Sequence, residues 1–225
     1  MPLSIIYQFK RLANIYFLFQ AVLSSIPAVS ALNPVSSYLA ILFILGVSVI
    51  REGIEDYERY KSDKVTNRQL VRILRNGKII EGESKNVTVG DIVLIEEDEF
   101  FPADLVMLAS SNENASCLIK TSSLDGESAP KVKKVPKGLD WVIPSGSAKF
   151  RPDELISTFK ATIEAPSSNL YSFEGKMFLA KKNYRLTYEQ ILLKGTQLTN
   201  TDWIIAFVAY TGKETRIMMN SQVSG

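Results

Sequence analysis

The sequence contains no histidine and a single cysteine, Cys117. The absence of histidine excludes imidazole acid–base catalysis and histidine-ligated metal sites, and we expect no metal site in this chain. A lone thiol cannot form an internal disulfide, so nothing in the composition indicates an oxidising compartment. The net charge of +2 gives no indication of a nucleic-acid partner. A glycine-rich phosphate loop ending in Lys-Ser or Lys-Thr is also missing.

Charged residues are missing between Arg11 and Arg51. A membrane-spanning helix needs about 20 predominantly apolar residues, and the charge-free stretch is about twice that length. It therefore predicts a membrane helical hairpin within residues 1–54. We expect the spans at residues 12–29 and 37–54, joined by a turn at Asn33-Pro34.

Basic residues flank the predicted hairpin on both sides. Lys10 and Arg11 precede it, and Arg51, Lys61 and Lys64 follow its second half. The positive-inside rule then predicts an integral, multi-pass membrane protein with both termini and the region after the hairpin in the cytoplasm. Two alternatives remain: a signal peptide cleaved within residues 28–31, or a helical hairpin buried in a soluble protein.

A helical, heavily charged segment follows at residues 55–68, which we interpret as a stalk that continues the second span. From Gln69 the hydrophobic period changes to two, which is typical of strands. The expected strands are Gln69–Arg75, Lys78–Gly82, Asp91–Glu96, Leu105–Ser110, Ala115–Thr121, Lys160–Ala165, Tyr171–Lys176, Ile191–Lys194 and Trp203–Tyr210. Asn76-Gly77 predicts a type I′ turn between the first two.

This spacing predicts a compact all-β domain over residues 69–213, either a small barrel or a distorted, double-wound, jelly-roll-like sandwich. Residues 139–157 contain Gly, Pro and Ser with little periodicity, and we interpret them as a surface insertion. Residues 214–225 are expected to form a linker that begins a helix returning towards the membrane.

The segment Leu124-Asp125-Gly126-Glu127-Ser128 follows a predicted strand and precedes a basic loop. Aspartate and glycine favour a tight turn, because the carboxylate bonds to backbone and glycine supplies a positive φ. The side chains of Glu127 and Ser128 would then project from the tip. Taken alone, such a segment is most often an ordinary surface turn.

The surrounding motifs give the chain a resemblance to the type IV P-type ATPases, the lipid flippases, over almost its full length. The segments that carry it, in order, are Phe9–Leu18, Val89–Val93, Pro102–Asp104, Leu124–Glu127, Asn169–Gly175, Ile191–Leu198 and Val208–Gly212. Asn169–Gly175 resembles a flippase-specific strand pair. The β domain would accordingly be the actuator domain of such an enzyme.

The resemblance implies a role for the Glu127 carboxylate. In the family, ATP phosphorylates an aspartate in another domain, and the glutamate of the actuator loop activates the water that hydrolyses the phosphate. Asp125, Gly126 and Ser128 would shape that loop, and Lys131 would contact the phosphorylated domain. Ser128 stands where the family usually has Thr, and Ala129-Pro130 where it has Asn-Leu, which is closer to the ion-pumping branches.

The same resemblance implies a lipid path along the first span, for which Asn14, Ser24 and Ser25 are the candidates. Small residues such as Ser24 and Ser25 also let membrane helices pack closely, and that alternative stays open. ATP and Mg²⁺ would serve the full-length enzyme, whereas this fragment would bind no cofactor and be inactive alone.

The implied partners are a phospholipid, the phosphorylation and nucleotide domains missing from this chain, and an accessory β-subunit. Other interpretations are a fragment of an ion-pumping P-type ATPase or a non-catalytic, membrane-anchored scaffold.

Overall fold

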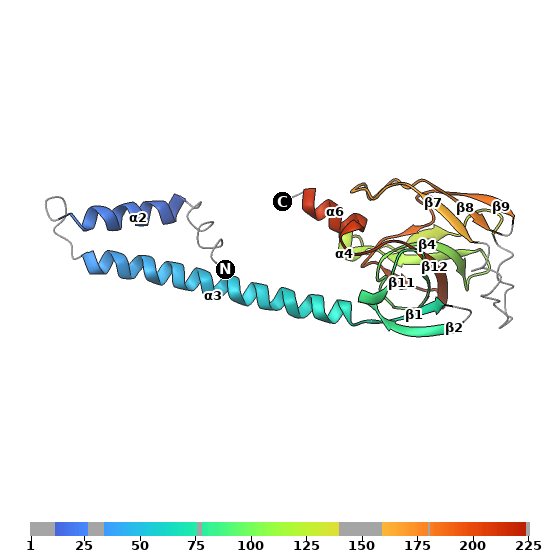
Figure 1. Ribbon diagram of the computed structural model, residues 1–225, viewed down its shortest axis with the longest axis horizontal. Helices are drawn as coiled ribbons and strands as arrows, with labels where there is room; N and C mark the ends of the chain where they lie inside the picture. The colour runs from blue at the N-terminus through green and yellow to red at the C-terminus, as the bar shows by residue number, and fades with distance from the viewer. Residues whose placement is uncertain (1–11, 27–33, 76–77, 140–158, 180, 224–225) are drawn as a thin grey trace. The chain divides into compact units, whose positions relative to one another are not determined.

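The computed structural model describes residues 12–26, 34–75, 78–139, 159–179 and 181–223, which fold as two compact units (Figure 1). The first unit is Met1–Val65 and the second, called the β domain below, is Thr66–Gly225. The predicted turn at Asn76-Gly77 and residues 140–157 of the predicted insertion lie outside the described residues.

The described residues of the first unit form two helices. Helix α2 spans Leu12–Ser24, and helix α3 spans Pro34–Asn67 as one continuous element. The Ser25 hydroxyl lies 2.8 Å from the Tyr38 hydroxyl, which ties the end of α2 to the start of α3. Residues 27–29, where the first predicted span ends, lie outside the described part. Among the helices of the described residues, none is both long and apolar enough to cross a membrane.

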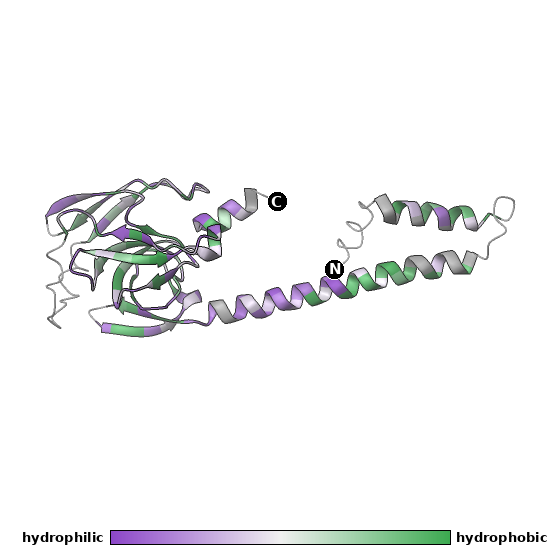
Figure 2. Cartoon of the chain, turned by 180° about the vertical axis from the view of Figure 1, so that it is seen from behind, coloured by the Kyte–Doolittle hydropathy of each residue, from purple (hydrophilic) through white to green (hydrophobic). Residues whose placement is uncertain are grey.

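The character of α3 changes along its length. Figure 2 shows apolar residues in the half that follows Pro34 and hydrophilic residues in the half that leads to the β domain. The change falls near Arg51, which pairs with Glu55 one turn later at 2.9 Å. Such an i,i+4 pair stabilises an exposed helix modestly.

The described part of the β domain contains three antiparallel sheets. The largest has the strand order β10-β4-β12-β3-β1-β2, and the others are β11-β5-β6 and β7-β8-β9. The strands are β1 Leu70–Arg75, β2 Lys78–Glu83, β3 Ile92–Glu96, β4 Asp104–Ser110, β5 Ser116–Lys120, β6 Lys131–Lys134, β7 Lys160–Ile163, β8 Gly175–Leu179, β9 Lys182–Leu186, β10 Ile191–Leu192, β11 Gln197–Thr199 and β12 Trp203–Tyr210. Short helices are η1 Ser84–Asn86, α4 Ser122–Asp125, η3 Gly212–Glu214 and α6 Arg216–Val223.

The core lies around β4 and β12, the two central strands of the large sheet. Every residue of β12 after Trp203 is buried, as is every residue of β4 before Ser110. Strands buried on both faces are continuous apolar runs rather than alternating ones, because both faces pack against other elements. The prediction of an all-β domain is confirmed.

Two local predictions in the β domain are wrong. Residues 169–174 form a loop, and β8 begins only at Gly175. The Asn169 side chain accepts a bond from the Tyr171 amide at 2.9 Å, and the Arg216 guanidinium binds the carbonyls of Asn169 and Ser172. These bonds replace the ladder that a strand would need.

The second error concerns the basic segment after the Glu127 turn. Lys131–Lys134 was expected to be a loop but forms β6, which pairs with β5 from Ile119↔Lys131 onwards. Lys133 is buried there. Strands β9 and β11 were not predicted.

Candidate functional site

The candidate site is the loop at residues 121–130, called the Glu127 loop, which joins the antiparallel strands β5 and β6. Buried Thr121 begins it, and its carbonyl accepts bonds from the amides of Leu124 at 2.8 Å and Asp125 at 3.1 Å. These bonds form the single turn α4. The loop therefore starts as a hydrogen-bonded turn rooted in the core.

Gly126 ends α4 in the left-handed region, with φ +72°. A Cβ at this position would meet no atom within 4 Å, so space does not require a glycine. The backbone conformation does, because L-residues with a side chain adopt positive φ at a cost.

Asp125 organises the loop. Its carboxylate accepts bonds from the Lys131 ammonium at 2.5 Å, the Glu127 amide at 3.0 Å and the Thr121 hydroxyl at 2.9 Å. These donors, Lys131 first and the Glu127 amide next, lower the pKa of Asp125 to about 2. The carboxylate is therefore ionised throughout the physiological range and acts as a fixed acceptor for three parts of the loop.

Lys131 binds a second carboxylate as well. Its ammonium lies 3.0 Å from Oε2 of Glu127, and its pKa is raised by Asp125 first and then by Glu127. The side chain of Glu127 is 61% exposed, compared with 23% for Asp125. The loop thus offers one accessible carboxylate and uses the other for its own structure.

Hydrogen bonds to the segment around Gly195 also anchor the loop. The Ser123 hydroxyl donates to the Gly195 carbonyl at 2.9 Å, and the Gly195 amide donates to the Phe101 carbonyl at 3.0 Å. Phe101 is 1% exposed, so these bonds connect α4 to the core. A group on such a support keeps its geometry better than one on an unsupported loop.

The structure brings four of the predicted residues together, Asp125, Gly126, Glu127 and Lys131, and it leaves Ser128 exposed after them. The predicted lipid-path residues belong to the first unit. Ser24 is buried and donates to the Gln20 carbonyl at 2.8 Å, which is a bond within α2. Asn14 lies in α2, but its side chain is outside the described part.

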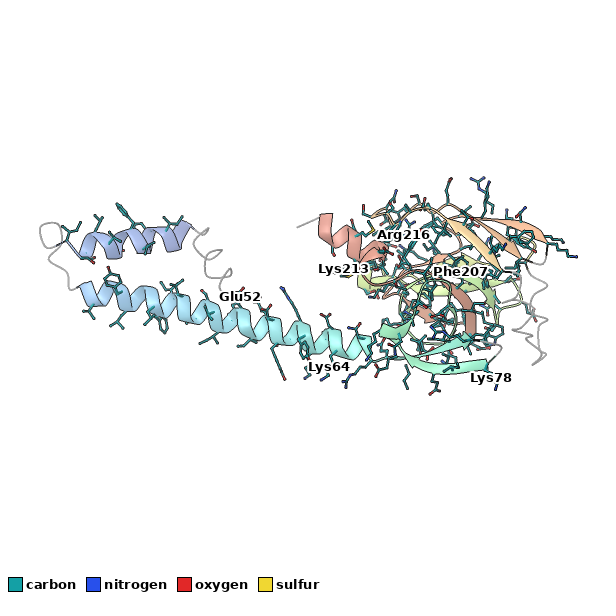
Figure 3. All side chains as sticks on the ribbon, viewed as in Figure 1. Glu52, Lys64, Lys78, Phe207, Lys213 and Arg216 are labelled. Carbon is teal, nitrogen blue, oxygen red and sulfur yellow. The ribbon has the colours of Figure 1, made fainter. Side chains whose placement is uncertain are left out.

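A buried polar cluster was missed at the sequence level. The carboxylate of Asp104 accepts bonds from the amides of Lys194 and Arg216, both at 2.8 Å, and burial raises its pKa. The fully buried guanidinium of Arg216, at the start of α6 (Figure 3), pairs with Glu164 and donates to the Ser172 carbonyl. Asp104 stands in a motif quoted above, but nothing in the local sequence points to Arg216 or Glu164.

The acidic side chains in the described part of the chain do not assemble into a metal centre. No group of three or more His, Cys, Asp or Glu residues there is arranged to hold a metal ion. The arrangement of the Glu127 loop instead suits proton transfer at an exposed carboxylate.

Comparison with known proteins gives two family matches. Residues 1–38 match the family described as phospholipid-translocating ATPase N-terminal, and residues 65–222 match the P-type ATPase actuator domain. The second match includes the whole Glu127 loop.

Similar proteins include two from Arabidopsis thaliana. Probable phospholipid-transporting ATPase 12 is 40% identical and phospholipid-transporting ATPase 10 is 37% identical, each over 98% of this chain. A phospholipid-transporting ATPase of Schizosaccharomyces pombe is 37% identical over 95% of the chain. The chain covers 17 to 18% of the length of these relatives.

Proposed function

Because the chain belongs to the phospholipid-translocating branch of the P-type ATPases, we propose that its β domain is the actuator of an ATP-driven phospholipid translocase. In this role the Glu127 loop hydrolyses the aspartyl phosphate that forms on another domain of the same ATPase. The observation that carries the proposal is the exposed Glu127 carboxylate on a loop that Asp125, Lys131 and Ser123 fix to the core.

The chemistry requires a base at this place. Water attacks the phosphorus, the bond from phosphorus to the aspartyl oxygen breaks, and inorganic phosphate leaves with the aspartate regenerated. The attacking water loses a proton as the new bond forms, and Glu127 takes it up. Gly126 has no Cβ, so the backbone beside Glu127 can approach a phosphoryl group closely.

The remaining loop residues serve this geometry. Asp125 and Gly126 set the path of the chain, and Ser128 adds an exposed hydroxyl next to Glu127. A fixed scaffold matters because a misplacement of about 1 Å can cost about 100-fold in rate.

We further propose that residues 1–54 form a membrane hairpin with spans at 12–29 and 37–54, followed by a stalk at 55–68. Residues 69–213 would form the actuator, and residues 214–225 a linker towards a third span. Exposed apolar side chains in the first unit support the hairpin, because a membrane would cover them. Among them are Phe43, which is 73% exposed, and Leu42, which is 69% exposed. The basic residues at both ends support a topology in which the termini and the β domain are cytoplasmic.

ATP and Mg²⁺ do not fit the residues described here. The chain has neither a phosphate-binding glycine loop nor an arranged group of metal ligands among its described residues. We therefore assign both to the phosphorylation and nucleotide domains of the complete ATPase. The phospholipid would pass Asn14, Ser24 and Ser25, and an accessory β-subunit is proposed from the family resemblance.

Lipid transport tests the proposal. The complete ATPase that carries this chain is reconstituted in vesicles, and ATP-dependent movement of fluorescent phospholipids is measured. Glu127→Gln should abolish transport, since loss of a general base costs about 10² to 10⁴ in rate. Glu113→Gln changes another exposed turn glutamate of the same domain and should transport normally. Normal transport by the Glu127 variant would contradict the proposal.

A further inference from the structure

One ammonium group bridges two carboxylates in the Glu127 loop. The Lys131 nitrogen lies 2.5 Å from Oδ2 of Asp125 and 3.0 Å from Oε2 of Glu127. The two acidic residues stand on the loop, whereas Lys131 is the first residue of β6 and is paired in register with Ile119 of β5. The ammonium that bridges the carboxylates therefore belongs to a strand of a sheet, whereas the two carboxylates belong to a turn.

The two carboxylates differ in how they are held. Asp125 also accepts bonds from the Thr121 hydroxyl and the Glu127 amide, so it has donors on the loop itself. The Glu127 carboxylate is ion-paired to Lys131 and otherwise extends into solvent on a 61% exposed side chain. A glutamate side chain in solvent samples several rotamers, and fixing it costs conformational entropy. The ion pair with a strand residue offsets that cost before the reaction begins.

Charge gives the same residue a second effect on Glu127. Without the ammonium, the carboxylates of Asp125 and Glu127 would repel each other, because both would remain negatively charged around the position that the Lys131 nitrogen occupies. Repulsion from the fixed Asp125 would turn the more mobile Glu127 side chain away from the loop. The Lys131 ammonium thus favours an orientation of the Glu127 side chain in which its carboxylate stays beside this lysine.

We propose that Lys131 is a positioning residue for Glu127. It holds the Glu127 carboxylate on the β6 side of the loop, so that this carboxylate is already oriented when it meets the phosphoryl group. This inference rests on the proposed function of Glu127 and adds a group that acts through it. It differs from a direct contact between Lys131 and the phosphorylated domain, in which the ammonium would act on the phosphate independently of Glu127.

The test is the rate constant of phosphoenzyme decay after ATP is removed from the complete ATPase. Lys131→Met and Lys131→Gln keep the length of the side chain to different extents but lack the charge, and each should slow decay about 10- to 100-fold. Lys131→Arg keeps a cation and should decay within about threefold of the wild type. Lys134→Met changes an exposed residue of the same strand and should leave the rate unchanged.

A double variant separates the possible roles. If Lys131 acts through Glu127, then Lys131→Met combined with Glu127→Gln should decay no more slowly than Glu127→Gln alone. Multiplied effects would show that Lys131 acts independently, and they would overturn the inference. A purely structural role would reduce the amount of phosphoenzyme but not the rate constant of its decay.

Wild-type decay in either neutral Lys131 variant would also overturn the inference. The failure of the proposed function is recognised differently, because Glu127→Gln itself would then decay at the wild-type rate, and both proposals would fall together.

Discussion

Replacing the buried Lys133 by methionine should stabilise the β domain at neutral pH. Lys133 is 4% exposed on β6, and its ammonium donates to the Tyr188 carbonyl at 2.7 Å and lies 3.4 Å from the centre of the Tyr188 ring. Burial lowers its pKa to about 8, with a smaller effect in the same direction from Lys131 and opposing effects from Cys117 and Glu189. Methionine fills a similar volume without a charge to desolvate.

The pH dependence gives the sign and the size of the effect. The folded chain binds the Lys133 proton more weakly than the unfolded chain, whose lysines titrate near about 10.4. The free energy of unfolding therefore rises with pH between about 8 and 10.4, by about 2.5 kcal/mol from pH 7 to pH 10. The ring and carbonyl of Tyr188 favour the charged ammonium, so we expect a measured rise of about 2 kcal/mol.

Cys117 changes the free energy of unfolding with pH in the opposite direction to Lys133. The lysine contribution is therefore measured by comparing a variant with the wild type. Burial raises the pKa of its thiol to about 12, so the folded chain keeps a proton that the unfolded chain loses above about 8.5. The wild-type curve therefore contains two slopes of opposite sign. The difference between wild type and Lys133→Met removes most of the thiol contribution and leaves the lysine contribution together with the weaker effect of the Lys133 charge on the pKa of Cys117.

The assay is urea unfolding of the full chain in detergent micelles, followed by tryptophan fluorescence at pH 7 and pH 10. The advantage of Lys133→Met over wild type should shrink by about 2 kcal/mol between the two values. Lys134→Met, on the exposed side of the same strand, should differ from wild type equally at both pH values. An advantage of Lys133→Met that does not change with pH would refute the reasoning.

Other changes test other parts of the structure. Gly126→Ala should lower the free energy of unfolding by about 1 kcal/mol in urea, because φ is +72° there; an increase would contradict this. Arg216→Met should cost about 3 kcal/mol in the same assay by leaving the Glu164 carboxylate and the carbonyls of Asn169 and Ser172 without the guanidinium that binds them. The exposed control Lys213→Met should stay within about 0.5 kcal/mol, and equal effects would argue against the buried cluster. The segments Asn86-Val87-Thr88 and Asn114-Ala115-Ser116 fit the acceptor pattern for N-glycosylation. In microsomes both asparagines should remain unglycosylated, and sugar on either would refute the cytoplasmic topology.

The sequence predicted the central strands well because their signals are local. Trp203–Tyr210 was expected as a strand with the bounds that β12 has, and Leu105–Ser110 differs from β4 by one residue. Their long runs of apolar residues can only be buried on both faces. The turn chemistry of Asp125-Gly126 is equally local, and the structure shows its bonds and its positive φ.

Contacts between distant segments were not predictable in this way. Lys131–Lys134 resembles a soluble loop, and its burial depends on Tyr188, which lies 55 residues after Lys133. The aromatic and β-prone residues of Tyr171–Lys176 suggested a strand. The carbonyl of Ser172 instead accepts a hydrogen bond from Arg216, which lies 44 residues later, and is not available for pairing with another strand. The hydrophobic periodicity of a segment carries no information about partners this distant in the sequence.

The geometry of the Glu127 loop was predictable in part for the same reason. Glu127 and Asp125 follow from a short motif, whereas the bridge from Lys131 to both carboxylates follows from the register of β6 on β5. A lysine four residues after a glutamate is common, and only the sheet shows that its side chain returns to the loop.

The decay of the phosphoenzyme tests the central proposal most directly. The complete ATPase is labelled with radioactive ATP, the ATP is removed, and the label on the protein is followed for wild type and Glu127→Gln. Glutamine keeps the shape of the side chain but cannot take up the proton of the attacking water, so label should form normally and persist about 10² to 10⁴ times longer. Decay of the Glu127→Gln phosphoenzyme at the wild-type rate would contradict the account.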